Sequence, residues 1–214
     1  MLFSTDRYLL ERERHDLALR LIHHEARTCT IRACTGLSDD RIRRLYRSYA
    51  HSKNITVRRR RGKAPRRIAF FTRNTQVQFE ASLLASLFVS FGLLRTRPRS
   101  SSRSLPAVES TRLFCDAYET HRQLFRITSI SLEHAWFLLH LLHRSSEAVQ
   151  SVRCRQCDSH YLRDRSGSRP RACPVCRLRR DARRPRRCAI DARCEAGPRA
   201  LRAAGVTAPS ATPS

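Results

Sequence analysis

Two close pairs of cysteines restrict the fold of this 214-residue chain more than any other feature. Cys154 and Cys157 are separated by two residues, fifteen residues follow, and Cys173 and Cys176 repeat the two-residue spacing. Two cysteines on one tight turn can direct both sulfurs to one ion, and two such turns supply the four tetrahedral thiolates of a closed Zn²⁺ site. The spacing therefore predicts one Zn²⁺ per chain. Accidental clustering, a redox pair and an iron–sulfur cluster are the alternatives.

A closed four-thiolate site leaves no open coordination position, so we expect it to act as a scaffold and not in catalysis. His160 lies three residues after Cys157, but with four thiols present we interpret it as a surface histidine. We find no cluster of carboxylates and histidines near the cysteines that could hold a catalytic metal. The sequence therefore argues against an enzyme.

The charge of the chain is strongly positive, with 43 basic and 18 acidic residues and a formal net charge of +25. This excess favours a polyanionic partner, nucleic acid first and an acidic membrane surface second, although a GC-rich genome also raises the arginine content. Thirteen arginines lie between Arg153 and Arg187, more than a zinc site would need to offset its charge. The surplus predicts a phosphate-contacting surface, for which we single out Arg163, Arg165, Arg169 and Arg171.

The chain before the cysteines reads as a helical body over residues 7–150. Apolar residues at helical spacing predict helices over about 7–28, 38–50, 74–91 and 107–125, and another that begins at Ser131. Residues 151–180 have few apolar side chains and form the predicted cysteine module, which burial alone cannot hold together. Residues 181–214 are rich in Arg, Ala and Pro. The predicted fold class is mainly α: a helical body, a small four-cysteine zinc-ribbon-like module and a disordered basic C-terminal tail.

Two of the predicted helices are apolar over more than one stripe, at residues 83–94 and 137–142. Either a partner protein covers part of this surface, or these helices form the centre of the chain's own bundle. The longest apolar run, 81–94, has 14 residues and is interrupted by serines, whereas a membrane span needs roughly 20. Because no secretory signal is visible either, we expect a cytoplasmic protein with reduced cysteines and no membrane contact.

Residues 29–50 also fit a helix-turn-helix, with a short helix, a turn at Gly36 and a second helix. Two packed helices joined by a glycine turn are common in any helical domain, which is the alternative reading. In a helix-turn-helix, four arginines of the second helix could face phosphates or bases: Arg41, Arg43, Arg44 and Arg47. The basic stretch that follows, 51–68, is predicted to be a loop or mobile arm and carries four consecutive arginines, Arg58, Arg59, Arg60 and Arg61.

Four stretches of the sequence resemble the FlhC family, the C subunit of the bacterial flagellar master regulator. They are "GLSDDRIRRLYR", "GKAPRRIAFFTRN" leading into "EASLLASLF", "SLEHAWFLLHLL", and the two cysteine pairs. The resemblance implies a helical subunit with Cys154, Cys157, Cys173 and Cys176 as zinc ligands. It also implies a complex with an FlhD-like subunit, a heterohexamer of four D and two C chains that binds promoter DNA and recruits RNA polymerase.

The most favoured function is therefore a DNA-binding transcriptional activator subunit that acts with a D-type partner at flagellar-type promoters. The alternative is a zinc-containing RNA- or ribosome-associated protein, because basic zinc modules also bind RNA. An RNA-binding protein would prefer structured RNA over a promoter duplex.

Overall fold

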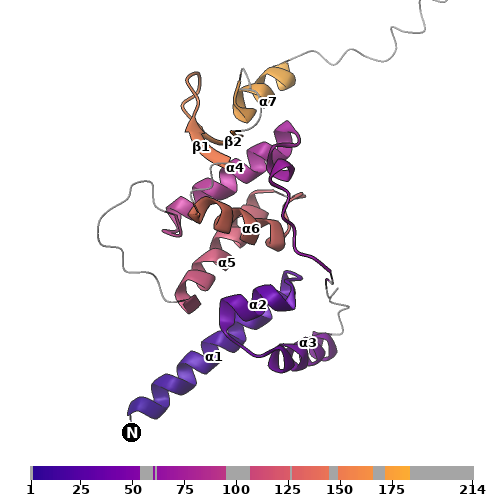
Figure 1. The fold of residues 1–214 in the computed structure, drawn as a ribbon, viewed down its shortest axis with the longest axis vertical. Coiled ribbons are helices and arrows are strands. Elements are labelled where there is room, and N and C mark those ends of the chain that lie inside the picture. Colours follow the sequence, from indigo (N-terminus) through magenta and orange to yellow (C-terminus); the bar gives the residue numbers. More distant parts are fainter. Residues whose placement is uncertain are drawn as a thin grey trace, which may run out of the picture.

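The computed structural model describes residues 2–53, 60, 62–94, 107–125, 127–144, 149–165 and 172–183. Helices dominate, as the sequence predicts, and a two-stranded hairpin lies near the C-terminal end (Figure 1). The predicted tail lies outside the described residues, except that the last helix runs to Arg183. In chain order the elements are α1 (Leu2–His23), α2 (Thr28–Thr35), α3 (Asp39–Lys53), the 3-10 helix η1 (Ile68–Thr72), α4 (Thr75–Ser90), α5 (Ala107–Leu124), α6 (Leu132–His143), β1 (Val149–Arg153), β2 (His160–Asp164) and α7 (Pro174–Arg183).

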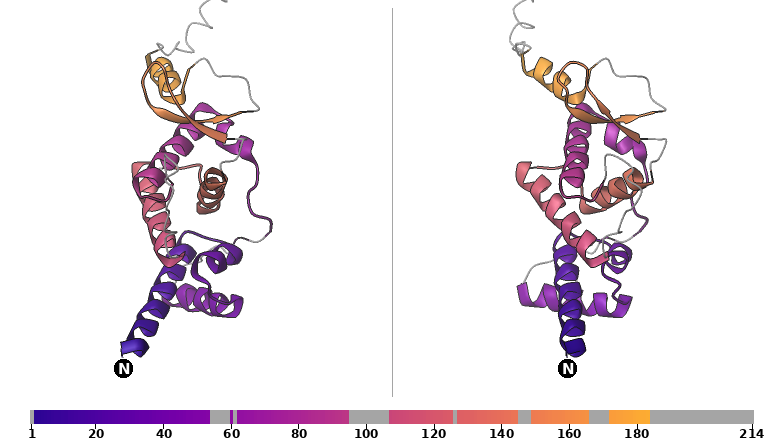
Figure 2. Two further views of the ribbon diagram at one scale, coloured as in Figure 1. Left: turned by 60° about the vertical axis from the view of Figure 1, so that its left-hand side comes forward. Right: turned by 90° about the vertical axis from the view of Figure 1, so that its left-hand side faces the viewer.

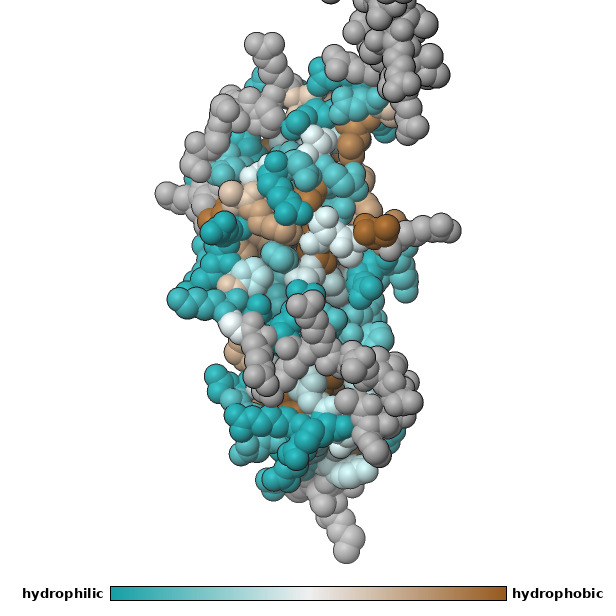
Figure 3. All heavy atoms as spheres, turned by 90° about the vertical axis from the view of Figure 1, so that its right-hand side faces the viewer, coloured by the Kyte–Doolittle hydropathy of each residue, from teal (hydrophilic) through white to brown (hydrophobic). Residues whose placement is uncertain are grey.

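The molecule is elongated (Figures 1 and 2). Helices α1, α2 and α3 form one end, with the N-terminus at its tip. Helices α4, α5 and α6 form the middle, and the hairpin with α7 forms the opposite end. On the face drawn in Figure 3, hydrophilic residues cover most of the surface, and apolar residues gather over part of its upper half.

Short-range hydrogen bonds explain where several helices begin and end. The Asn74 side chain accepts from Val77 N (2.8 Å) at the start of α4, and Ser131 caps α6, as the sequence predicts. Gly36 and Gly92 follow α2 and α4 with φ of 71° and 75°. Glycine adopts this left-handed conformation without steric cost, so both residues serve as helix stops.

One hydrophobic core joins the helices. Its fully buried side chains come from η1 (Phe71), α4 (Phe88), α5 (Phe114) and α6 (Leu138), among others. The two strongly apolar stretches seen in the sequence contribute Leu84, Phe88, Leu93, Leu138, Leu139 and Leu141 to this core. Much of their apolar surface is therefore covered by the chain itself, which supports the second of the two readings given above.

The hairpin is docked on α4 and shares the main core. Val149 pairs with Asp164 at one end of the antiparallel ladder, and Leu162 is fully buried. The Gln78 side chain donates to Leu162 O (2.8 Å), and Leu162 N donates to Ser82 Oγ (2.9 Å). The predicted boundary at residue 150 therefore falls within a strand that packs on the helical body.

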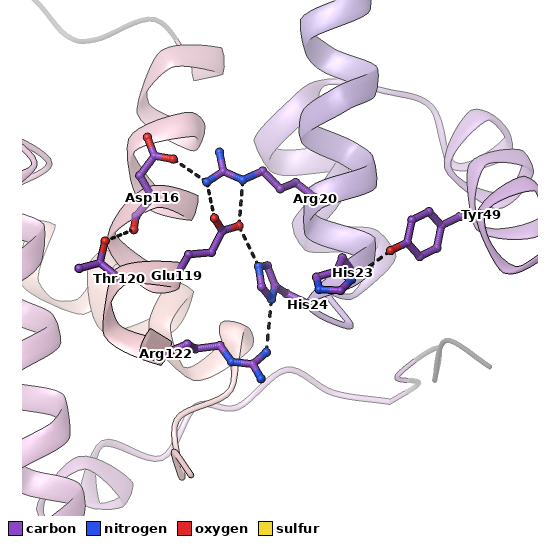
Figure 4. Close-up of polar contacts among 8 residues, drawn as sticks. All are labelled: Arg20, His23, His24, Tyr49, Asp116, Glu119, Thr120 and Arg122. Carbon is purple, nitrogen blue, oxygen red and sulfur yellow. Dashed lines mark hydrogen bonds and ion pairs between the residues drawn. The ribbon is translucent and has the colours of Figure 1, made fainter. Parts of the chain in front are cut away.

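A polar cluster fastens α1 to α5 (Figure 4). The Arg20 guanidinium donates to both oxygens of Glu119 (2.8 and 2.7 Å) and to Asp116 (2.5 Å), and His24 Nε2 lies 2.9 Å from Glu119. Burial lowers the pKa of His24, although Glu119 opposes this. Burial raises the pKa of Glu119, but hydrogen bonds from Arg20 and His24 outweigh it and hold that pKa below its usual value. The ionised Glu119 therefore joins the first helix to the middle of the molecule.

Candidate metal centre and nucleic-acid interface

The first cysteine pair lies on the tight turn that connects β1 to β2. Cys154 N donates to Ser159 O (3.0 Å) and Asp158 N donates to Cys154 O (3.0 Å), which closes the turn. Asp158 has φ of 65°, a conformation that Asp tolerates better than most residues. Within the turn, Gln156 N lies 3.4 Å from Cys154 Sγ and can donate to it.

The second cysteine pair lies at the start of α7. Cys173 directly precedes Pro174, the first residue of the helix, where the missing N–H of proline costs nothing. Cys176 N lies 3.4 Å from Cys173 Sγ, so a backbone N–H faces this sulfur as well. Backbone N–H groups aimed at both sulfurs favour the thiolate form that a metal binds.

The four sulfurs converge. Their Sγ atoms all lie within 4.8 Å of one another, and Cys157 Sγ is 3.3 Å from Cys173 Sγ. With a Zn–S bond of about 2.3 Å, a tetrahedral site separates its sulfurs by about 3.8 Å, so the arrangement fits Zn²⁺. The cysteines are free thiols, and Cys154 and Cys173 are buried. The four residues predicted from the spacing are therefore positioned to bind a metal ion.

The environments of the thiols differ. The hydrogen bond with Ser159 is the main reason that the pKa of Cys157 is lowered to about 6, whereas burial raises the pKa of Cys173 to about 12. A bound cation would offset the cost of ionising the buried thiol. His160 is exposed at the start of β2 and lies outside the four-residue cluster, in agreement with its reading as a surface histidine.

Three arginines of α7 lie beside the metal centre. Arg179, Arg180 and Arg183 are exposed, and they line an open hollow of about 510 Å³ whose wall includes Cys157 and Cys176. None of the three has an ion-pair partner among the described residues. The list drawn from the sequence omitted them, although they stand at i+3, i+4 and i+7 from Cys176, which places all four on one helix face.

The arginines singled out from the sequence near the cysteines have mixed surroundings. Arg165 is exposed at the end of the hairpin, whereas Arg163 is half-buried on β2 and its Nε is buried without a hydrogen-bond partner in the described structure. Arg169 and Arg171 lie outside the described residues. Nearby, the Arg153 guanidinium forms an ion pair with Asp158.

The predicted helix-turn-helix segment consists of α2, the turn at Gly36 and α3. Ile42 and Tyr46 bury one face of α3, and the four arginines singled out there are all exposed. Two of them are already paired: Arg41 with Glu11 (3.0 Å) and Arg43 with Asp40 (2.9 Å). In the described structure, Arg44 and Arg47 have no ion-pair partner.

The acidic residues at the start of α3 argue against base contacts by this segment. Asp39 and Asp40 occupy the first turn of α3. In a DNA-binding helix-turn-helix the first residues of the second helix contact base edges, where carboxylates would repel the phosphates on either side. Of the basic run that follows, Arg60 forms an ion pair with Glu25 (2.8 Å). Arg58, Arg59 and Arg61 lie outside the described residues.

The structure does not bring the two groups of arginines together. Helix α3 lies near the N-terminal end of the elongated molecule, and α7 lies at the opposite end (Figure 1).

In the described part of the chain, every helix is too short or too polar to span a bilayer.

Comparison with known proteins identifies the family. The family model described as "Flagellar transcriptional activator (FlhC)" matches residues 5–189, a range that includes every described element from α2 to α7 and nearly all of α1. A comparison with curated proteins gives no significant match. The matched family is one of transcription regulators and not of enzymes. Because the match spans far more than half of the chain, and four cysteines positioned to bind a metal converge as described, the chain belongs to the FlhC family of flagellar transcriptional activators.

Proposed function

We propose that this chain is the DNA-binding C subunit of a cytoplasmic transcriptional activator. It acts with a D-type partner, in a heterohexamer of four D and two C chains, at flagellar-type promoters, where the complex recruits RNA polymerase. The family match supports activation. The observation that carries DNA contact is the unpaired arginine face of α7 beside four converging thiols.

We also propose that the four cysteines hold one Zn²⁺ and that its role is structural. Four thiolates fill a tetrahedral site, so no position remains for a water or a substrate. Cys154 and Cys157 belong to the hairpin turn, and Cys173 and Cys176 belong to α7. These cysteines therefore join two elements that have little apolar surface to hold them together, and they fix the arginine face of α7 relative to the hairpin.

Phosphate contact is the chemistry that this surface offers. Arginine donates forked hydrogen bonds that suit phosphate oxygens, and it stays charged at any relevant pH. We propose that Arg179, Arg180 and Arg183 join Arg165 and the half-buried Arg163 at the backbone of the duplex. Phosphate contacts set affinity and position and do not themselves read sequence. Arg44 and Arg47 of α3 are the candidates for a second contact at the other end of the molecule.

The test is reconstitution of the complex. The chain is co-expressed with a D-type subunit from the same genome, and the purified complex is footprinted on flagellar-type promoter fragments and on scrambled duplexes. We expect protection that is selective for promoters, activated transcription with RNA polymerase, and one zinc per C chain by elemental analysis. Preference for structured RNA over promoter duplex would favour the RNA-associated function instead, and iron or no metal in reduced protein would contradict the zinc assignment.

A further inference from the structure

The N-terminal half of α1 extends beyond the rest of the molecule (Figures 1 and 2). The later part of the helix is buried in the core through Leu17 and Leu21. By contrast, Tyr8, Leu9 and Leu10 are 68%, 50% and 40% exposed. They are three of the six large apolar residues that the described part of the chain exposes. We refer to residues 7–16 as the α1 projection.

The three apolar side chains point in different directions because successive residues of an α-helix are rotated by about 100°. A flat partner surface could cover one or two of them, whereas a groove could cover all three. A hollow lies on each of two sides of the projection, where the walls of such a groove could enter. Tyr8 lines an open hollow of about 570 Å³ towards α3, and Leu10 lines another of about 470 Å³ towards the start of α5.

The charge of the α1 projection sets it apart from the rest of the chain. Residues 7–16 contain three acidic and three basic residues, whereas the whole chain has 18 acidic and 43 basic ones. This near-neutral surface is unsuited to nucleic acid, whose binding requires a surplus of cations. A second copy of the chain is disfavoured because each copy carries a net charge of +25. A different protein is the partner that these charges fit.

The hollow towards α3 has a mainly basic lining, with Arg7, Arg12 and Arg41 beside Glu11, so the hollow towards α5 indicates the charge only of the part of the partner that faces it. The hollow towards α5 is lined by the carboxylates of Glu13, Asp16 and Glu109 and by the guanidinium groups of Arg20 and Arg112. Arg20 already pairs with two carboxylates of α5, so the hollow presents a surplus of negative charge. Basic side chains on the rim of the partner's groove would complement it.

The projection is held in place before any partner binds. Glu11 forms an ion pair with Arg41 of α3 (3.0 Å), and Arg20 ties the middle of α1 to α5. A helix that is already formed and oriented loses little conformational freedom on binding. This favours docking of a rigid helix into a groove over folding on contact.

We propose that the α1 projection is the docking surface for the D-type subunit. That subunit receives the helix in an apolar groove, with basic residues on the groove's rim opposite Glu13 and Asp16. The inference rests on the proposed function, because it takes the partner from there and adds the surface that binds it.

The test compares two pairs of substitutions in the full chain with its metal. Leu9→Glu with Leu10→Glu removes the apolar surface of the projection, and Val89→Glu with Leu124→Glu changes two exposed apolar residues on α4 and α5 as the matched control. Glutamate is a good helix former, so all four sites keep their helices. We expect the affinity for the purified D-type subunit, measured by calorimetry, to fall at least tenfold for the first pair, and to change less than about twofold for the control.

A second variant, Glu13→Arg with Asp16→Arg, changes only exposed side chains and tests the charge of the groove's rim. We expect it to slow association with the D-type subunit and to weaken the salt dependence of that rate. If both variants keep wild-type affinity and association rate, the docking proposal is wrong while the proposed function stands. If the unsubstituted chain does not bind the D-type subunit, the partner in the proposed function is wrong and the docking proposal falls with it.

Discussion

At the scale of single residues, Glu133 has a role that its position in the sequence conceals. It lies in the first turn of α6 and is only 4% exposed. Its carboxylate accepts hydrogen bonds from Arg27 N (2.7 Å) and from the Thr30 hydroxyl (3.1 Å). Arg27 is the N-cap residue of α2, and its side chain makes no capping bond there. Glu133 therefore supplies the acceptor that the start of α2 lacks.

We expect Glu133→Gln to lower the free energy of unfolding by about 1–3 kcal/mol, because an amide keeps one acceptor oxygen but loses the charge. Glu109→Gln, at an exposed residue in the first turn of α5, is the matched control and should change it by less than about 0.5 kcal/mol. Urea unfolding followed by circular dichroism measures both. Equal midpoints for the two variants would show that Glu133 does not stabilise the start of α2.

The sequence places the start of α4 near Asn74 and the start of α6 at Ser131, but it does not indicate the contact of Glu133 with α2. Asn74 and Ser131 each bond a backbone N–H three residues ahead, so the cap and its target lie in one short window. Glu133 and Arg27 are 106 positions apart. An acidic residue in the first turn of a helix also interacts favourably with the dipole of that helix. The position of Glu133 is therefore explained by α6 alone, and the sequence does not indicate a bond to α2.

His121 makes stability depend on pH. Its side chain is fully buried on α5, and Nε2 lies 3.2 Å from Glu80 O. Burial lowers its pKa below the ordinary value of 6.5 despite that contact. The unfolded chain therefore takes up a proton more readily than the folded one, so stability is complete above about pH 6.5 and falls as the pH drops through the folded pKa. Burial lowers the pKa of His24 as well, which acts in the same direction.

We expect His121→Phe to flatten the dependence of unfolding free energy on pH between about 7.5 and 5.5, because the aromatic ring remains and the titrating nitrogen is removed. Denaturant unfolding at several pH values in this window measures it. His160→Phe, at an exposed histidine, is the control and should keep the wild-type slope. If His121→Phe keeps the full slope, other groups cause it.

At the scale of elements, we expect the two parts of the cysteine module to depend on a bound metal to different degrees. The hairpin is anchored to α4 through Leu162, which is fully buried and whose backbone N–H and C=O both bond to side chains of α4. Along α7 only Pro174 is buried. The sequence suggested that residues 151–180 would unfold together without metal. The structure leads us to expect that α7 is lost first and that the hairpin strands remain.

We expect Cys157→Ser to remove the metal and to raise hydrogen exchange throughout residues 174–183, while the amide of Leu162 stays protected by its bond to Ser82. Cys29→Ser, at an exposed thiol outside the cluster, is the control and should leave metal content and exchange unchanged. Deprotection of Leu162 to the same extent as α7 would mean that the hairpin also depends on the metal.

The sequence predicted the helices and the cysteine cluster better than the packing between them. Helical periodicity places α4 and α5 within about two residues of their observed bounds, and the spacing of the cysteines picks out the four converging thiols. The docking of the hairpin on α4 was not foreseen, because it depends on Gln78 and Ser82, two polar residues in a mostly apolar helix. Their bonds reach across at least 80 residues, beyond any local pattern.

At the scale of the whole molecule, two groups of exposed arginines without ion-pair partners in the described structure lie at opposite ends. Arg44 and Arg47 belong to α3 near one end, and Arg179, Arg180 and Arg183 belong to α7 at the other (Figure 1). Between these ends lies a body whose helices bury their apolar faces in one core. An elongated chain that carries unpaired arginines at both ends can contact one duplex at two separate places, provided that its partner subunits hold it along the DNA.

Two sets of substitutions test this arrangement in the assembled complex: Arg44→Gln with Arg47→Gln, and Arg179→Gln with Arg180→Gln and Arg183→Gln. Each phosphate contact that is lost should reduce the slope of log affinity against log salt by about one unit. Because distant sites act independently, the combined variant should lose the sum of the two separate changes. Arg7→Gln with Arg12→Gln, on the near-neutral α1 projection, should leave the slope unchanged. If the α3 substitutions leave the salt slope unchanged while the α7 substitutions reduce it, DNA contact is confined to the end with the four cysteines. That result would exclude the helix-turn-helix segment as a reader of DNA.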